Sequence, residues 1–144
     1  MKVIRIAQVP PPTVEVTATV MDAVVAMQNA RGGATAVLDG EKLAGIFSER
    51  DVMLRVVGRR RNPEETAVGE VMTPTVRTVI EGAEAGDALE LMISQHIRHL
   101  PIVNEAGRLV GLISIRNLLH HHVEDLVDQL NSLEAYFSAD GPGG

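Results

Sequence analysis

Two short segments of the sequence carry residue types suited to binding a phosphorylated sugar. Residues 45–51 place Ser48 three positions before Asp51, and residues 111–117 place Ser114 at the equivalent point of a second copy. In both segments an apolar run typical of a strand gives way to the start of a helix. A helix N-terminus offers free N–H groups and a partial positive charge, which suit an anion such as phosphate. A carboxylate such as Asp51, one turn further on, can accept hydrogen bonds from the diol of a ribose.

The same serine and aspartate also fit a purely structural role. Ser48 followed by Asp51 resembles a capping box, and a cap of this kind stabilises a helix by roughly 0.5–2 kcal/mol. The second copy favours a binding site, because two equivalent helix starts would border a shared cleft if the copies pack together. Four basic side chains near these segments in the sequence could contact phosphate: Arg50, Arg116, Arg98 and His99.

Both segments belong to an internal repeat that organises most of the chain. Thr13 matches Thr78 at an offset of 65 residues, and after one extra residue in the second half Ser48 matches Ser114 at an offset of 66. In each half the patterns predict a strand, a helix, two strands joined by a tight turn, and a second helix. The predicted ranges are a helix at 20–30, strands at 34–38 and 43–47 and a helix at 49–57, then a helix at 89–96, strands at 100–103 and 109–113 and a helix from 115 onward.

One such unit would leave an apolar sheet face uncovered, and two units related by a pseudo-twofold axis would cover it. We therefore predict a mixed α/β fold (α+β) in which residues 8–61 and 71–126 are two repeats of a single module spanning 1–144. The linker between them contains three consecutive arginines (59–61), a run that is typical of a solvated turn and that could also hold a phosphate.

Composition excludes several classes of function. The chain has 144 residues, a formal net charge of −6 and no cysteine, which excludes disulfides, thiolate catalysis and cysteine-type zinc sites and fits the cytoplasmic location that we expect. Its acidity and its shortage of aromatic residues argue against a nucleic-acid partner. No apolar run approaches the ~20 residues of a membrane span, so we expect no membrane partner either. The first residues lack the apolar stretch of a signal peptide.

In combination, these motifs resemble the CBS-domain pair, or Bateman module, and in particular short stand-alone bacterial proteins of that type. The first copy has the glycine, two apolar residues, serine or threonine, two variable residues and aspartate of that family. The resemblance also covers residues 71–74, a usual start of the second CBS repeat, and residues 98–103, a usual middle strand. It extends over about residues 8 to 126, nearly the entire chain.

The resemblance implies a regulatory, non-catalytic module that binds an adenosine-containing ligand in the clefts between its two repeats. The ligands typical of the family are AMP, ADP, ATP, S-adenosylmethionine and NAD(H). An ATP ligand would bring Mg²⁺ with it, and no other cofactor or metal is implied. The family also implies a homodimer that acts on a regulated protein, which is unknown here.

The same resemblance assigns residues to two sites. In the first, Asp51 would hold the ribose and Ser48 and Arg50 would lie near the phosphates. The residues that would enclose the adenine of that site are Thr78, Val79 and Ile97. In the second site, with Asn117 at the position of Asp51, the residues facing the phosphates would be Ser114, Arg116, Arg98 and His99. The residues flanking the second base would be Thr13, Ala18 and Gly33.

Each site departs from the family pattern at one point. Asn117 is neutral, and a hydrogen bond to a charged acceptor contributes roughly 1.5–3 kcal/mol against about 1 kcal/mol for a neutral one. In the first site, Ala34 stands where Arg98 and His99 supply cations in the other repeat. With few aromatic residues, the base would lie between aliphatic side chains, which predicts modest affinity.

Residues 118–137 predict an amphipathic C-terminal helix with a narrow apolar seam. The seam steps by four and three residues, as in a coiled coil, and consists of Leu119, Val123, Leu126, Leu130, Leu133 and Phe137. Such a helix could lie along its own domain or pair with a second chain, and the narrowness of the seam favours pairing. The adjacent histidines 120–122 point in different directions on a helix, so we predict no metal site there.

Three classes of function remain in competition. The first is a regulatory module that senses an adenine nucleotide, and this class is favoured. The second is an enzyme, which is disfavoured because the sequence has no glycine-rich phosphate loop, no nucleophile–base pair and no metal-ligand spacing. The third is a protein interaction or dimerisation module without a physiological ligand, because every candidate residue also fits a cap or a solvated surface.

Overall fold

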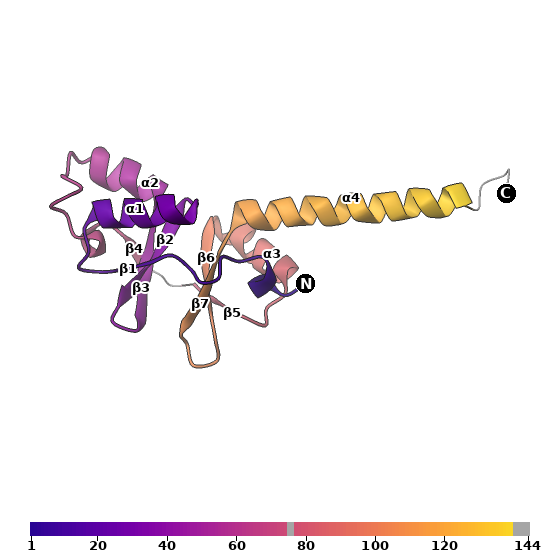
Figure 1. The fold of residues 1–144 in the computed structure, drawn as a ribbon, viewed down its shortest axis with the longest axis horizontal. Helices are drawn as coiled ribbons and strands as arrows, with labels where there is room; N and C mark the ends of the chain where they lie inside the picture. Colours follow the sequence, from indigo (N-terminus) through magenta and orange to yellow (C-terminus); the bar gives the residue numbers. More distant parts are fainter. Residues whose placement is uncertain (75–76, 140–144) are drawn as a thin grey trace.

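Two small sheets with helices packed against them form the body of the molecule, and one long helix projects from it (Figure 1). The computed structural model describes residues 1–74 and 77–139. The first sheet has the strand order β1-β2-β3-β4, and the second has the order β5-β6-β7. The first half contains η1 (Val3–Arg5), β1 (Thr13–Glu15), α1 (Val20–Ala30), β2 (Ala34–Asp39), β3 (Lys42–Ser48), α2 (Glu49–Asp51), η2 (Val52–Val57) and η3 (Val68–Glu70). The second half contains β4 (Thr73–Pro74), β5 (Val79–Ile80), α3 (Ala85–Gln95), β6 (His99–Val103), β7 (Leu109–Ser114) and α4 (Ile115–Ala139).

The two halves have the same strand pairing. β1 runs parallel to β2, and β2 and β3 form an antiparallel hairpin, while β5, β6 and β7 repeat this arrangement. Ala34 pairs with Ser48 in the first hairpin, and His99 pairs with Ser114 in the second. The extra residue of the second half therefore lies in the β6–β7 turn, where the repeat alignment puts it. The predicted α/β fold with two tandem repeats is confirmed.

Two helices differ in detail from the prediction. The segment expected as one helix at 49–57 begins with the single α-helical turn α2 and continues as the π-helical η2. Helix α3 ends at Gln95, and His96 follows it in the left-handed conformation with a φ of 55°. His99 already belongs to β6, so His96 and His99 do not share a helix face.

The segment that leads into each repeat packs on the other repeat. We call residues 3–8 and 68–74 the lead-in segments. Val3 is fully buried in the core of the second repeat, and Val68 is fully buried in the core of the first. The Val3 N–H donates to the carbonyl oxygen of Ala83 at 2.8 Å, and the Val68 N–H donates to that of Ala18 at the same distance. The exchange is thus symmetric, and it ties the repeats together.

A glycine in each repeat makes room for the exchanged segment. Thr73 of β4 pairs with Ile46 of β3, directly beside Gly45, and a Cβ added at Gly45 would lie 2.5 Å from the carbonyl oxygen of Thr73. Gln8 forms the equivalent bridge to Leu112 in the second repeat. The glycine that opens the repeated motif is therefore required by close backbone approach rather than by a turn.

Helix α4 belongs to the body only in its first turn. Leu118 is buried in the core of the second repeat, whereas the large apolar residues from Leu119 onward are exposed. Figure 1 shows the helix extending away from both sheets. The alternative in which this helix lies along its own domain therefore does not describe the structure.

Within residues 1–74 and 77–139, every helix is either too short or too polar to cross a lipid bilayer.

We predict that Gly45→Ala lowers the free energy of unfolding by about 1–3 kcal/mol, the usual cost of overpacking a tight site. The added methyl group would collide with the backbone of Thr73 and push β4 off the sheet. Urea unfolding followed by circular dichroism measures the change. Gly86→Ala in α3 is the matched control: its Cβ would have no neighbour within 4 Å, so stability should stay the same or rise slightly. Equal effects of the two substitutions would contradict this role for Gly45.

Candidate functional site

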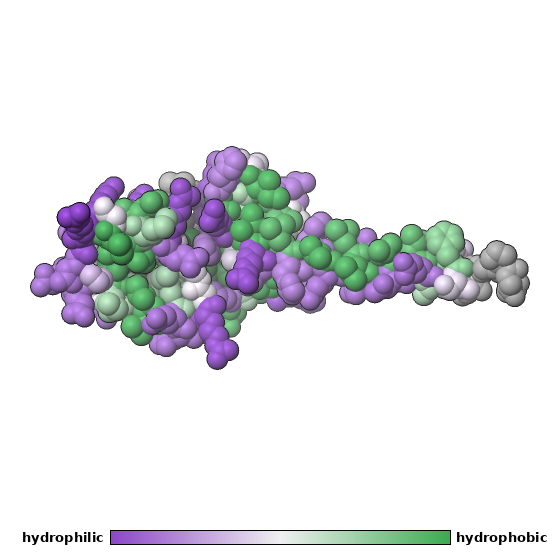
Figure 2. Space-filling view, turned by 90° about the horizontal axis from the view of Figure 1, so that it is seen from above, coloured by the Kyte–Doolittle hydropathy of each residue, from purple (hydrophilic) through white to green (hydrophobic). Residues whose placement is uncertain are grey.

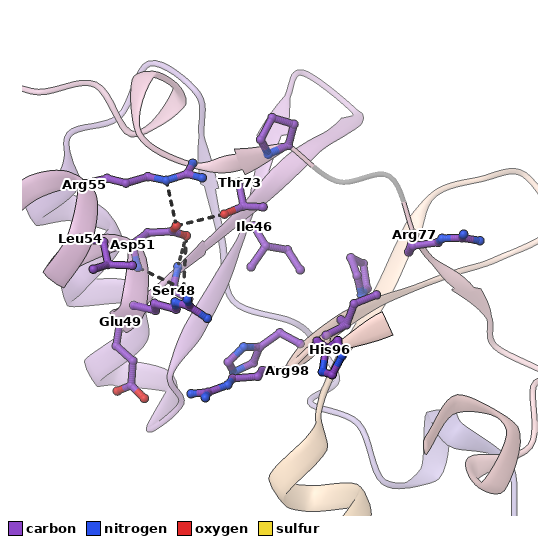
Figure 3. A pocket seen from close by; sticks show the side chains of 15 residues that line it. Ile46, Ser48, Glu49, Asp51, Leu54, Arg55, Thr73, Arg77, His96 and Arg98 are labelled. Carbon is purple, nitrogen blue, oxygen red and sulfur yellow. Dashed lines mark hydrogen bonds and ion pairs between the residues drawn. The ribbon is translucent and has the colours of Figure 1, made fainter. Parts of the chain in front are cut away.

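A cavity of about 400 Å³ lies where the β3–α2 junction of the first repeat faces the start of β6 in the second (Figure 3). We call it the Asp51 cavity. Its volume is within the range of pockets that hold small ligands. Six residues expected from the sequence line it: Ser48, Arg50, Asp51, Ile97, Arg98 and His99. Nine further lining residues have no site role predicted from the sequence: Ile46, Glu49, Leu54, Arg55, Thr73, Pro74, Arg77, His96 and Pro101.

Asp51 is 6% exposed and is held by both repeats. Its Oδ2 accepts hydrogen bonds from the backbone N–H of Ser48 at 3.0 Å and from the Ser48 hydroxyl at 3.2 Å. Its own N–H donates to Ser48 Oγ at 3.3 Å, which completes a capping box. Its Oδ1 accepts from the Thr73 hydroxyl at 3.0 Å. The carboxylate is therefore a helix cap that is also oriented by the lead-in segment of the second repeat.

Arg55 fixes the same lead-in segment from the other side. Its Nε lies 3.6 Å from Asp51 Oδ1, and its Nη1 donates to the carbonyl oxygen of Met72 at 2.7 Å. The Arg55 side chain is positioned one helical turn after Asp51. Arg55 and Thr73 together connect Asp51 to the lead-in segment 68–74, so a displacement of this segment would change the hydrogen bonds of the carboxylate.

Arginine side chains from both repeats line the rest of the cavity, together with the carboxylate of Glu49. Figure 3 shows Arg98 and His96 on the second repeat, across the cavity from Ser48 and Asp51 on the first. Within the described parts of the chain, Arg50, Arg77 and Arg98 form no ion pair with a carboxylate. Their charges are therefore available to an anionic ligand. A ligand with negative charge at one end and hydroxyl groups at the other would match this lining.

His99 lies at the start of β6 and lines the cavity. Burial lowers the pKa of His99 from its ordinary value of 6.5, and the nearby Arg98 lowers it further. Glu49 and Asp51 act in the opposite direction without overcoming the burial. His99 is therefore a neutral imidazole at pH 7, and an anion placed beside it would favour its protonation.

The remaining sequence-predicted residues lie outside the Asp51 cavity. Ser114 caps α4 by accepting a hydrogen bond from the N–H of Asn117 at 3.1 Å. Arg116 and Asn117 are exposed, unlike the buried Asp51. The residues expected to flank the two bases are dispersed. Thr13 is exposed on β1, and Ala18 and Val79 pack against the cores of the first and second repeat, respectively. The Gly33 carbonyl oxygen accepts a hydrogen bond from the N–H of Glu49, and Thr78 borders a separate hollow near the hairpin turns.

The structure also changes the grouping of the cations. From the sequence, Arg98 and His99 are expected beside Ser114, and the first site is expected to be short of positive charge. His99 does pair with Ser114 in the second hairpin, but both residues also line the Asp51 cavity, because the face-to-face packing of the repeats brings the start of β6 opposite the β3–α2 junction. The cation missing at Ala34 is thus supplied by the other repeat.

Among residues 1–74 and 77–139, no group of three or more histidine, cysteine, aspartate or glutamate side chains is arranged to hold a metal ion.

Comparison with known proteins gives consistent matches along the chain. The family model of the CBS domain matches twice, at residues 3–58 and 68–124. The structure superposes with a TM-score of 0.77 on a CBS-domain protein from Burkholderia ambifaria that is 35% identical, covering 87% of this chain and 96% of that one. It superposes with a TM-score of 0.73 on a CBS domain protein from Pyrobaculum aerophilum solved in complex with AMP, which is 27% identical, covering 81% of this chain and 89% of that one.

Two curated relatives are longer than this chain. It is 32% identical over 123 residues to the mitochondrial CBS domain-containing protein CBSX3 of Arabidopsis thaliana, covering 82% of this chain and 59% of that protein. A protein of Methanopyrus kandleri, uncharacterised, is 35% identical over 88 residues, which are 61% of this chain and 45% of that protein. The two family matches start in the exchanged lead-in segments and together include the whole Asp51 cavity. The chain therefore belongs to the CBS-domain family and carries two CBS domains in tandem.

Proposed function

We propose that the Asp51 cavity binds an adenosine nucleotide such as AMP or ATP and that the chain is a non-catalytic sensor of this ligand. One observation carries the proposal: a cavity of suitable size combines a buried carboxylate with Arg50, Arg77 and Arg98, which have no carboxylate partner among residues 1–74 and 77–139. The relative from Pyrobaculum aerophilum, whose structure contains AMP, supports the choice of ligand.

The lining suggests how each part of the nucleotide is held. Asp51 Oδ2 accepts two hydrogen bonds from Ser48, whereas Oδ1 accepts only one, from Thr73, with Arg55 Nε 3.6 Å away. A ribose hydroxyl would therefore bind at Oδ1, which it would share with Thr73 and Arg55. The guanidinium groups of Arg50 and Arg98 suit the phosphates, because a guanidinium can bind phosphate through two parallel hydrogen bonds. Apolar atoms of Ile97 are left for the adenine.

Ligand binding at Asp51 would affect the contact between the two repeats. The ribose hydroxyl would either displace the Thr73 hydroxyl from the Asp51 carboxylate or share the carboxylate with it, and Thr73 is part of the lead-in segment that joins the repeats. A ligand that favours one arrangement of this segment shifts the population of that arrangement. We propose that a homodimer transmits this shift to a separate regulated protein. A module that only mediates protein association, with an empty cavity, is the alternative.

Asp51→Ala should weaken AMP binding at least tenfold, because the ribose loses its acceptor. The substitution also removes the N3 side chain of the Ser48 capping box and the acceptor of the Thr73 hydroxyl, so circular dichroism must show the variant folded at the temperature of the titration. Isothermal titration calorimetry measures the affinity. Asn117→Ala, at the equivalent exposed position of the second repeat, is the control and should bind AMP as the native chain does. Unchanged affinity in Asp51→Ala would mean that the residue is only a cap.

The free protein should lose stability as the pH falls below about 6.5, the pKa of an unperturbed histidine. The pKa of His99 is lowered in the folded state, so the unfolded chain takes up a proton first and is favoured by acid. The free energy of unfolding should stop falling once the pH is below the pKa of His99 in the folded state. Urea unfolding between about pH 7.5 and 5.5 measures the slope. His99→Gln should flatten it, and His122→Gln on the projecting helix should not; equal slopes in both variants would assign the effect to other groups.

AMP should favour the protonated form of His99, whereas the free folded protein favours the neutral form. A phosphate beside the imidazole favours its protonated form, so binding should take up a proton near the ordinary histidine pKa. Calorimetric titrations in buffers of different ionisation enthalpy measure the uptake, and His99→Gln should reduce it. A buffer dependence that is the same in the native chain and in the variant would place the phosphate away from His99.

A further inference from the structure

The projecting part of α4 carries an unpartnered apolar stripe. Figure 2 shows hydrophobic side chains running along this helix beside polar ones. The stripe contains eight large residues that are 42–63% exposed: Leu119, Val123, Leu126, Val127, Leu130, Leu133, Tyr136 and Phe137. Surface of this extent on a projecting helix marks an interaction site, because water disfavours contiguous apolar patches.

The spacing of the stripe is that of a coiled coil. Leu119, Leu126 and Leu133 occupy one core position of successive heptads, and Val123, Leu130 and Phe137 occupy the other. The stripe extends over about 27 Å of helix, or nearly three heptads. A seam of this length needs a partner helix of similar length.

We propose that α4 pairs with α4 of a second copy of this chain, and that the two helices run antiparallel. The inference rests on the proposed homodimer and is independent of nucleotide binding. In the antiparallel register the seam is complementary to itself, with three layers that each occur twice: Leu119 with the partner's Phe137, Val123 with the partner's Leu133, and Leu126 with the partner's Leu130.

The residues that flank the seam distinguish the two directions. In the antiparallel register His120, now 3.0 Å from Glu124 of its own helix, lies opposite the partner's Glu134, and Val127 lies opposite the partner's Val127. In a parallel pair, Val127 would instead face the partner's His122. The antiparallel direction therefore places His120 beside the partner's Glu134, and it covers Val127, the apolar residue that lies next to the seam on the same side as His120 and Glu134.

The area is sufficient for a specific dimer. If pairing covers most of the exposed stripe on both helices, it removes about 1,200 Å² from water, which is the lower end of the range for stable protein interfaces. The antiparallel direction also places the two bodies at opposite ends of the helix pair. Neither body then has to approach the other.

Single cysteines test the direction without ambiguity, because the native chain has none. Val123→Cys and Leu133→Cys are prepared as separate full-length variants, mixed, and oxidised. The antiparallel pair predicts a disulfide-linked dimer in the mixture and none in either variant alone, because two copies of residue 133 would be about 15 Å apart along the axis. Asp128→Cys, which faces away from the seam, is the control and should stay uncrosslinked.

A disulfide in Leu133→Cys alone would overturn the antiparallel direction in favour of a parallel pair.

Light scattering of the native chain should give twice 15.5 kDa, and the full-length double variant Leu126→Asp, Leu130→Asp should give 15.5 kDa. A native chain that is monomeric, or a double variant that stays dimeric, would overturn pairing through α4. AMP titrations of the same variants separate the two proposals, since the seam lies outside the Asp51 cavity.

Discussion

The exchange of lead-in segments between the repeats is the interaction on which the rest of the structure depends. Val3 and Val68 each complete the core of the opposite repeat, and Gln8 and Thr73 each add to the edge of the opposite hairpin beside a glycine. The apolar side chains of one repeat therefore cannot be fully buried without a segment that belongs to the other. This mutual dependence holds the β3–α2 junction of one repeat against the start of β6 in the other, and the Asp51 cavity is the space between them.

The two halves share a fold but differ in the chemistry that they present. The lead-in segment of the second repeat delivers the Thr73 hydroxyl to Asp51, and burial holds that carboxylate in place. At the equivalent point, the amide of Gln8 donates to the carbonyl oxygen of Ala30, and Asn117 is exposed. Duplication thus preserved the scaffold while the polar groups diverged. A neutral, solvated Asn117 has less to offer a ribose than a charged acceptor held between two repeats.

The sequence predicts the fold well because its signals are local. Turn residues and the hydrophobic spacing define each hairpin and helix, and the repeat offset locates the extra residue in the second turn. Ser48 and Asp51 are also recognisable, since a cap requires a particular spacing along the chain. Arg55 and Thr73 are missed, because their importance comes from the exchanged segment rather than from any pattern near Asp51. The contribution of Arg98 and His99 to the Asp51 cavity is also missed, because a repeat alignment identifies equivalent residues and does not say which of them face each other across the pseudo-twofold axis.

The central claim is that the two repeats form one ligand cavity at Asp51, and nuclear magnetic resonance tests it most directly. In an AMP titration of the ¹⁵N-labelled chain, the account predicts that amide signals of residues 48–51 and 96–99 shift together and saturate with one affinity, because both segments line the same cavity. Signals of the exposed residues Arg116 and Asn117 should shift little. Shifts confined to residues 114–117, or an unchanged spectrum at millimolar AMP, would contradict the account.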